Sequence, residues 1–169
     1  MGFDQSLLDG TIGEYIVWNF FNDSTGVKEV IDVRCDKVFQ MWDVDFLILD
    51  SKRQVSWIEV KTDFKAHETG NFVYEVASNR NFNTIGCLEK TKAQIIACFV
   101  PVSANLYLIS VAKLKKFVQS NNLNLVNMGD NAKGFLLPIA ELERNGVIQG
   151  MFDVSKYYRG EKTCRFYPM

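Results

Sequence analysis

Two acids and a lysine interrupt a pair of otherwise apolar segments. Glu59 and Lys61 lie two residues apart in VSWIEVK, and Asp45 directly precedes FLIL. On a strand, side chains at i and i+2 point the same way, so Glu59 and Lys61 should emerge side by side. A hairpin partner strand lies about 4.8 Å away, so Asp45 can approach Glu59 where the register allows.

This set of side chains suits one kind of chemistry. Two carboxylates, together with water and a substrate phosphate, are ligands that Mg²⁺ accepts. A lysine beside them could orient or deprotonate the attacking water, or stabilise the charge that develops on phosphorus. The pattern therefore indicates a site that hydrolyses a phosphodiester bond.

The setting of this tripeptide distinguishes it from two similar ones. An acid two residues before a lysine also occurs at Asp50–Lys52, within the polar turn DSKRQ, and at Asp63–Lys65, beyond the strand. Only Glu59–Lys61 lies within an apolar strand that follows a second strand opened by an acid. A structural ion-pair cluster is the competing interpretation, but buried ion pairs contribute little net stability, which favours a functional role.

Hydrophobic periodicity predicts the elements that must position these residues. Residues 5–22 carry apolar side chains at helical spacing, and residues 111–121 form an amphipathic helix. A hairpin is expected with strands at 42–49 and 54–61. Further elements are strands at 28–34, 72–77, 94–101 and 105–110, a short helix or turn near 87–93 and a short helix near 141–146, with the apolar segments LNLVNM and GFLLPI between the long helix and the last short one. This order predicts an α/β fold with a central mixed sheet, covered on both faces at the hairpin.

Length and composition exclude several classes of protein. The chain has 169 residues, which fits one domain or one domain with an elaboration. No apolar run reaches the roughly 18–20 residues that span a membrane, and no secretion signal is visible. One histidine and four widely spaced cysteines do not form a zinc motif, so we expect reduced cysteines and a cytoplasmic location. The net charge of −1 does not by itself indicate a nucleic-acid binder.

DFLIL followed by WIEVK resembles the signature of the PD-(D/E)XK nucleases, a superfamily that includes many restriction endonucleases and the archaeal-type Holliday junction resolvases. The resemblance implies a restriction-endonuclease-like core of order α-β-β-β-α-β within residues 1–118. Residues 119–169 then form a C-terminal elaboration that packs on the same domain. It also implies direct attack of water on phosphorus, with Mg²⁺ as the cofactor and Mn²⁺ as a substitute.

The roles of the superfamily carry over to matching positions. Asp45 and Glu59 become metal ligands together with the Val60 carbonyl, and Lys61 becomes the catalytic lysine. Many members also have a glutamate on the first helix that points at the metal, and Glu14 in GTIGEYIVWNFF matches that position. It would bind through water or a second ion.

The sequence departs from the signature at one position and leaves one assignment open. Val44 stands where the family name has proline, and Asp43 competes with Asp45 for the role of first acid. Asp45 is favoured because four apolar residues follow it directly.

The segment GCLEKTKAQIIACFV is similar to the region after the same strand in small phage and plasmid nucleases. In that comparison Lys90, Lys92 and Gln94 face DNA or the scissile phosphate. The expected partner is therefore DNA rather than a membrane. A homodimer is also expected, because a symmetric duplex or junction matches a two-fold protein.

The predicted function is a Mg²⁺-dependent DNA endonuclease, acting on branched DNA or on recombination and repair intermediates. Three alternatives are a non-catalytic nucleic-acid-binding or assembly module that retains the fold, an RNA-directed or repair nuclease with the same site, and a protein-interaction domain.

Other residues have weaker claims to a role in the site. His67 and Glu75 are candidates for an additional base and acid, and the pair Trp42 and Trp57 is most simply core. The C-terminal tail interleaves aromatic and basic side chains, as single-strand binders do, although a tail that packs on the domain fits equally well. Its residues are Tyr157, Tyr158, Arg159, Lys162, Arg165 and Phe166.

Overall fold

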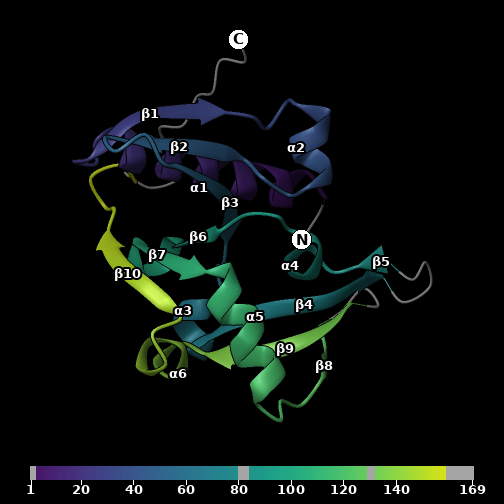
Figure 1. The fold of residues 1–169 in the computed structure, drawn as a ribbon. Helices are drawn as coiled ribbons and strands as arrows, with labels where there is room; N and C mark the ends of the chain where they lie inside the picture. Colours follow the sequence, from purple (N-terminus) through teal and green to yellow (C-terminus); the bar gives the residue numbers. More distant parts are fainter. Residues whose placement is uncertain (1–2, 80–83, 129–131, 159–169) are drawn as a thin grey trace.

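Two β-sheets and the helices around them make up the structure (Figure 1). It is a computed structural model that describes residues 3–79, 84–128 and 132–158. In the larger sheet β3 and β6 run parallel and the other neighbours antiparallel, so the predicted mixed sheet is confirmed. In spatial order its six strands are β1 (Val27–Asp32), β2 (Phe46–Asp50), β3 (Val55–Thr62), β6 (Ile95–Val100), β7 (Asn105–Ser110) and β10 (Ile148–Asp153).

The smaller sheet packs against one face of the larger one. The chain forms part of it in the crossover from β3 to β6 and completes it after residue 118. Apolar side chains of both sheets, among them Phe72, Leu137 and Ile96, share one hydrophobic core. In spatial order its four strands are β5 (Thr84–Ile85), β4 (Asn71–Asn79), β9 (Lys133–Pro138) and β8 (Val126–Asn127).

Helices of very different length surround the sheets. The helices are α1 (Phe3–Asn22), α2 (Lys37–Met41), α3 (Ala66–Thr69), α4 (Cys87–Lys90), α5 (Val111–Ser120) and α6 (Ile139–Arg144), and Pro101–Ser103 forms a 3-10 turn. The long helix α1 covers the face of β1–β3 and β6 that the smaller sheet does not (Figure 1). Across the described part of the chain, no helix combines the length and apolar character needed to cross a membrane.

Gly13 allows α1 to lie directly on β3. A Cβ atom at Gly13 would stand 2.0 Å from Thr62 Oγ1, closer than atoms can approach. One turn further along, Ile16 and Val17 are fully buried in the core between helix and sheet. The glycine therefore sets the depth at which the first helix, and with it Glu14, meets the sheet.

The two faces of β3 have different surroundings. Ile58 and Val60 point into the core beneath α1. Because side chains alternate along a strand, Glu59 and Lys61 point to the opposite side, towards the smaller sheet. Glu59 is only 5% exposed, so this acid lies in the interior of the protein. The prediction that the second hairpin strand is covered on both faces is confirmed for this half of β3.

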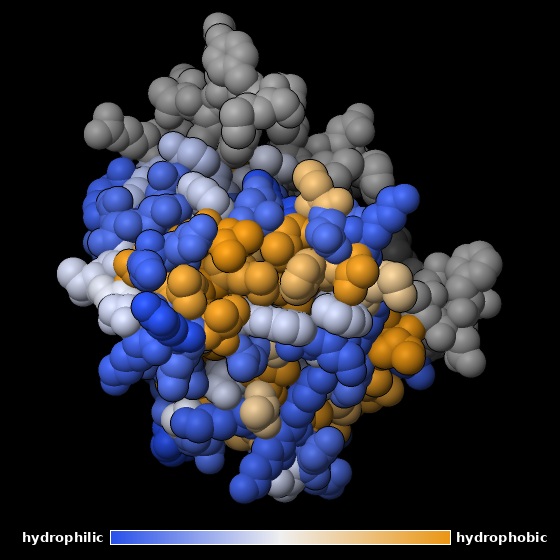
Figure 2. All heavy atoms as spheres, turned by 45° about the horizontal axis from the view of Figure 1, so that its top comes forward, coloured by the Kyte–Doolittle hydropathy of each residue, from blue (hydrophilic) through white to orange (hydrophobic). Residues whose placement is uncertain are grey.

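The outer face of β1 and β2 carries a small apolar cluster to which helix α2 contributes Phe39. The register places Ile31, Leu47 and Trp57 in one row across the strands on the side away from α1. Trp57 stacks on Trp42, with ring centroids 5.5 Å apart and planes 13° apart, and Phe39 packs against both. Figure 2 shows a band of apolar side chains on this part of the surface. Trp42 and Trp57 were predicted to lie in the core. Both rings are partly exposed, so this prediction is confirmed only in part.

The region before β2 differs from the prediction of a strand starting at residue 42. Asp36 accepts hydrogen bonds from the Val38 and Phe39 N–H groups and so begins helix α2. Asp43 then adopts a left-handed φ of 47°, which turns the chain before β2 begins at Phe46. Local capping by a short acidic side chain therefore overrides the apolar pattern.

The C-terminal region is part of both sheets. Residues 119–169 were expected as an elaboration on the same domain. In the structure β9 pairs with β4 inside the smaller sheet, and β10 pairs with β7 at the edge of the larger one. The implied core order α-β-β-β-α-β is not confirmed: between β3 and β6 the chain forms α3, β4, β5 and α4, and the four-residue α4 lies where a short helix near 87–93 was predicted.

Candidate active site

Asp45 lies where strand β2 meets the middle of β3. Pairing of the two strands begins at Phe46 and Ile58, and the Asp45 N–H donates to the Ile58 carbonyl at 2.8 Å. Asp45 Oδ2 in turn accepts the Val60 N–H at 2.7 Å. The N–H and C=O of one strand residue point to the same side, so the Val60 carbonyl faces the same space as this carboxylate. The aspartate and the backbone carbonyl that the sequence predicts are therefore neighbours.

Glu59 and Lys61 form an ion pair on the face of β3 that looks towards the smaller sheet. Lys61 Nζ lies 2.5 Å from Glu59 Oε1. Burial raises the pKa of Glu59 to about 8, although the Lys61 ammonium acts to lower it. Burial acts to lower the pKa of Lys61, but Glu59 and its neighbours outweigh it and the pKa of Lys61 is raised. The lysine is therefore a firmly protonated cation beside an acid that resists ionisation.

Asp45 also resists ionisation. Burial raises the pKa of Asp45 to about 6, opposed by its hydrogen bond from the Val60 N–H and reinforced by the nearby Glu14. The charge of Asp45 in turn raises the pKa of Glu59. Two acids whose charges disfavour each other lie together, and a bound cation would stabilise both in their ionised forms.

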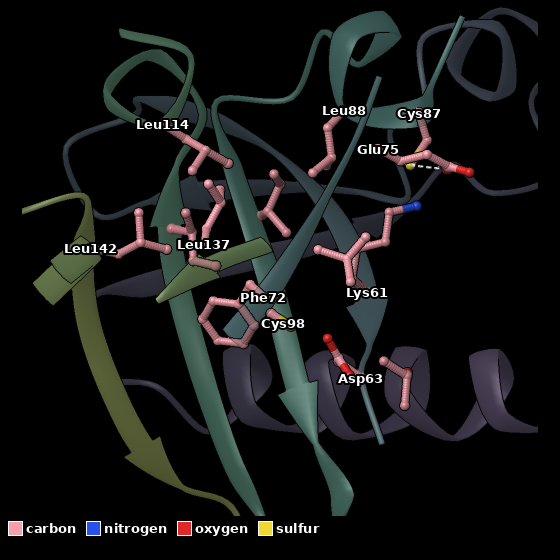
Figure 3. Close-up of a pocket in the computed structure, with 14 residues that line it drawn as sticks. Lys61, Asp63, Phe72, Glu75, Cys87, Leu88, Cys98, Leu114, Leu137 and Leu142 are labelled. Atoms are coloured by element: carbon pink, nitrogen blue, oxygen red, sulfur yellow. Dashed lines mark hydrogen bonds between the residues drawn. The ribbon is translucent and has the colours of Figure 1, made fainter. Parts of the chain in front are cut away.

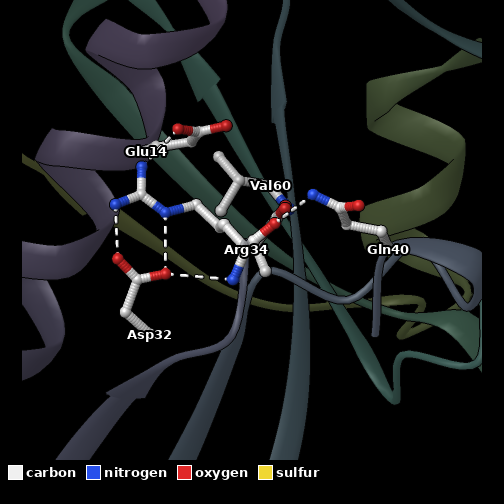
Figure 4. Close-up of polar contacts among 6 residues, drawn as sticks. Glu14, Asp32, Arg34, Gln40 and Val60 are labelled. Carbon is white, nitrogen blue, oxygen red and sulfur yellow. Dashed lines mark hydrogen bonds and ion pairs between the residues drawn. The ribbon is translucent and has the colours of Figure 1, made fainter. Parts of the chain in front are cut away.

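Glu14 approaches from α1 but is held by an arginine that the sequence analysis missed. Arg34 lies between two acids (Figure 4): it contacts Glu14 with Nη1 and Asp32 with Nη2 at 2.5 Å and Nε at 2.9 Å. These partners raise the pKa of Arg34. The signal for this residue was the Asp32–Arg34 spacing at the end of β1, which places both groups on one side of the chain.

Asp43 occupies a separate position from Asp45. Its Oδ1 pairs with Lys90 Nζ at 3.0 Å, and its backbone carbonyl accepts the Thr91 hydroxyl at 2.8 Å. Its Oδ2 is buried and has no hydrogen-bond partner among the described residues. Its charge contributes to the raised pKa of Glu59. The geometry gives Asp45 the contact with β3 and leaves Asp43 at the side of the site, beside Lys90.

The predicted DNA-facing residues have different surroundings. Lys90 reaches Asp43 and is half exposed. Lys92 is also exposed, and its N–H donates to the Trp42 carbonyl at 2.8 Å. Gln94 Oε1 instead accepts the Trp57 N–H at 2.9 Å, so that oxygen extends the β3–β6 ladder. Contact of these three with DNA stays a prediction, and for Gln94 a structural role already accounts for its carbonyl group.

The weaker candidates differ in their surroundings. His67 is exposed on α3. Glu75 lies beside Cys87, with Oε2 3.6 Å from Sγ, near Lys61 at one end of a cavity (Figure 3). In the tail, the Tyr157 hydroxyl donates to Asp23 at 2.8 Å and Tyr158 packs on Phe99, which fits an ordered segment. Arg159, Lys162, Arg165 and Phe166 lie outside the described residues.

The donor set fits part of a magnesium shell. Asp45, Glu59 and the Val60 carbonyl offer oxygen atoms only, as Mg²⁺ prefers, and this ion usually keeps several waters. Within residues 3–79, 84–128 and 132–158, no group of three or more His, Cys, Asp and Glu side chains is gathered closely enough to hold an ion. Glu14, the third acid that the sequence predicts for the site, is paired with Arg34.

Comparisons with known proteins give two distant structural likenesses. No family model matches the chain, and no curated protein sequence matches it. A bacterial homing endonuclease is similar over 62% of this chain and 68% of its own, with 18% identity and a TM-score of 0.44. A nuclease from a fusselovirus is similar over 81% of this chain and 82% of its own, with 12% identity and a TM-score of 0.38. Likenesses of this size do not place the chain in a family.

Proposed function

We propose that the protein is a metal-dependent endonuclease that hydrolyses phosphodiester bonds in DNA. The observation that supports this most directly is the meeting of Asp45, Glu59 and Lys61 at one point of the larger sheet. Grouping a buried acid with a second acid and a lysine that are only partly exposed yields little stability, so a purely structural role is a poor explanation for them. The three groups are also those that metal-assisted phosphodiester hydrolysis requires.

The metal would be Mg²⁺, with Mn²⁺ as a substitute. Asp45, Glu59 and the Val60 carbonyl would hold it, and Glu14 would join them directly or through water once it leaves Arg34. A bound ion would supply Lewis-acid stabilisation of the charge on a phosphate. The hydrogen bond from the Val60 N–H fixes Asp45 Oδ2 in the plane of the sheet and leaves Oδ1 for coordination.

Lys61 would act as a cation and hydrogen-bond donor. Its raised pKa keeps Nζ protonated at neutral pH. One N–H is directed to Glu59, and the others are available to orient the attacking water or to donate to a phosphate oxygen. In the pairing seen here, Lys61 therefore favours charge stabilisation over the alternative role of a base.

The substrate and assembly remain proposals. Lys90 and Lys92 would contact DNA phosphates beside the site. The preference for branched DNA or for recombination and repair intermediates follows only from the sequence resemblance. A homodimer would match the two-fold symmetry of a duplex or junction, and a cytoplasmic location would suit reduced cysteines.

Cleavage assays on several DNA structures test the proposal. Wild-type protein is incubated with supercoiled plasmid, linear duplex, a flap and a four-way junction in Mg²⁺ or Mn²⁺, with a matching RNA duplex alongside. We expect cleavage of DNA that EDTA abolishes and that Lys61→Met reduces by roughly a hundredfold or more. Lys52→Met is the matched control, because it changes the lysine of the similar tripeptide in an exposed turn.

The other functional classes give different results in the same experiment. If no nucleic acid is cleaved but DNA is retained in a binding assay, the chain is a non-catalytic binding module. Preference for RNA would reassign the substrate. If Lys52→Met and Lys61→Met lose the same activity, the assignment of Lys61 is wrong.

A further inference from the structure

A cavity of about 270 Å³ lies in the core between the two sheets, at the inner end of the candidate active site (Figure 3). Its walls are mostly aliphatic, with one aromatic ring and one buried thiol. They come from both sheets and from α4, α5 and α6: Phe72, Leu88, Ile96, Cys98, Ile109, Leu114, Leu137 and Leu142. Nearly all of these side chains are themselves less than 9% exposed.

Protein interiors are close-packed, and voids larger than a water molecule are few. An empty space of this size would leave its walls without contacts and so cost stability in proportion to its volume. Apolar cavities of about 150 Å³ already take up molecules such as benzene, and they stay dry because their walls offer water no partners. The size and the walls together indicate a site for an organic ligand.

Polar groups line this cavity at two places, one at Thr62 and Asp63 and the other at one end of the cavity. Figure 3 shows Lys61, Glu75 and Cys87 together at that end, with Leu114 and Leu142 at the other. The lining contributes two acids, Glu75 and Asp63, and one cation, Lys61, whose Nζ contacts Glu59. A ligand with an anionic end would therefore be repelled. A nucleobase would bury several polar edge atoms against aliphatic walls, which also disfavours it.

We propose that this cavity binds a small neutral molecule with an apolar body and a single hydrogen-bonding group, whose polar end lies beside Lys61, Glu75 and Cys87. The inference does not depend on the proposed nuclease activity, because it follows from the shape and chemistry of the core. The ligand would nevertheless touch Lys61, so the two sites share a residue.

Binding is tested on the full chain with benzyl alcohol, toluene and benzoate, followed by methyl NMR and by thermal unfolding. We expect saturable shifts of the lining Leu and Ile methyl signals and a melting temperature that rises with benzyl alcohol concentration. Toluene should bind more weakly because it lacks the hydroxyl, and benzoate should bind at least tenfold more weakly. Absence of saturable binding for all three would refute the proposal.

Cavity-filling variants locate the site. Leu114→Phe and Leu142→Phe should each abolish benzyl alcohol binding. Leu108→Phe is the control, because Leu108 lies on the opposite face of β7 and packs against the core beneath α1. If the folded filling variants bind the probe as the wild type does, the ligand lies elsewhere and the proposal fails. Testing both variants guards against one of them failing to fold.

Discussion

The Asp45 carboxylate takes the place of strand β2 beside Val60. Its Oδ2 accepts the Val60 N–H at 2.7 Å, at the point where the ladder between β2 and β3 has ended. The carboxylate therefore lies in the plane of the sheet, where the charge of Glu14 raises the pKa of Asp45 and the charge of Asp45 raises the pKa of Glu59. The hydrogen bond from the Val60 backbone therefore holds the Asp45 side chain in one orientation, between the face of the sheet under α1 and the face towards the smaller sheet.

Replacing Asp45 separates its structural role from its binding role. In Asp45→Asn the side-chain carbonyl can still accept the Val60 N–H, so the fold should be kept. We expect Mn²⁺ affinity, measured by calorimetry, to fall on the order of tenfold or more. Asp45→Leu leaves a buried N–H unpaired and should also lower the free energy of unfolding by about 1–3 kcal/mol. Asp36→Asn, at an exposed helix cap, is the control, and unchanged Mn²⁺ affinity in Asp45→Asn would exclude Asp45 as a ligand.

The raised pKa values of the buried acids predict how stability depends on pH without metal. The pKa of Glu59 rises from 4.5 to about 8, and that of Asp45 rises from 3.8 to about 6. Between these values the folded protein holds protons that the unfolded chain has released, so the stability that these two acids contribute is greatest at low pH and is lost as pH rises through their folded-state pKa values. We expect the melting temperature in EDTA to fall by several degrees between about pH 5 and pH 8.5.

Glu59→Gln should flatten this pH dependence, because the amide cannot ionise. Glu68→Gln changes an exposed glutamate on α3, and the pH dependence of the melting temperature should stay the same as in the wild type. The same steep dependence in Glu59→Gln and in the wild type would show that Glu59 ionises normally.

Glu14 and Arg34 should affect metal binding in opposite directions. Arg34 holds the Glu14 carboxylate that the site otherwise lacks. Arg34→Gln should release Glu14 and raise Mn²⁺ affinity, whereas Glu14→Gln should lower it, by less than Asp45→Asn does. The double variant should match Glu14→Gln alone. If Arg34→Gln weakens Mn²⁺ binding while Asp32→Asn does not, the arginine supports the site and does not compete for its ligand.

Substitutions of Lys90 and Asp43 should change DNA affinity in opposite directions. A lysine that contacts a phosphate releases a counterion, so Lys90→Ala should weaken binding to all DNA sequences and reduce the salt slope of the binding constant by about 1. Asp43→Asn removes the partner 3.0 Å from Lys90 Nζ and should strengthen binding. Fluorescence anisotropy in EDTA measures both without cleavage. Lys116→Ala, on the exposed side of α5, is the control, and an equal loss there would mean that the effect is only net charge.

The strand geometry of the candidate residues was predicted better than the chain path that leads to them. The alternation of Ile58, Glu59, Val60 and Lys61 is a local property of β3, so the sequence was enough to place the acid and lysine on one face. The start of β2 was placed too early, because the side-chain cap at Asp36 competes with an apolar strand pattern. Arg34 was missed because its partner Glu14 lies twenty residues away, and pairings of that range depend on tertiary packing.

Gly13 and Gly10 provide a matched pair of substitutions for the placement of α1. A Cβ atom at Gly13 would stand 2.0 Å from Thr62 Oγ1 and 3.3 Å from Thr62 Cβ, whereas one at Gly10 would meet nothing within 4 Å. Alanine favours a helix interior over glycine by roughly 0.5–1 kcal/mol, so Gly10→Ala should stabilise the protein in urea unfolding.

Gly13→Ala should instead destabilise the protein by about 1–3 kcal/mol, because the stiff threonine side chain cannot yield without moving the helix. Thr62 Oγ1 is buried without a hydrogen-bond partner among the described residues, so removing it costs no polar contact shown by the structure. Thr62→Ala in the Gly13→Ala background should therefore restore much of the lost stability. If the two alanine substitutions at 10 and 13 have equal effects on stability, α1 does not lie on β3 at this distance. The position of Glu14 next to the candidate site would then be wrong as well.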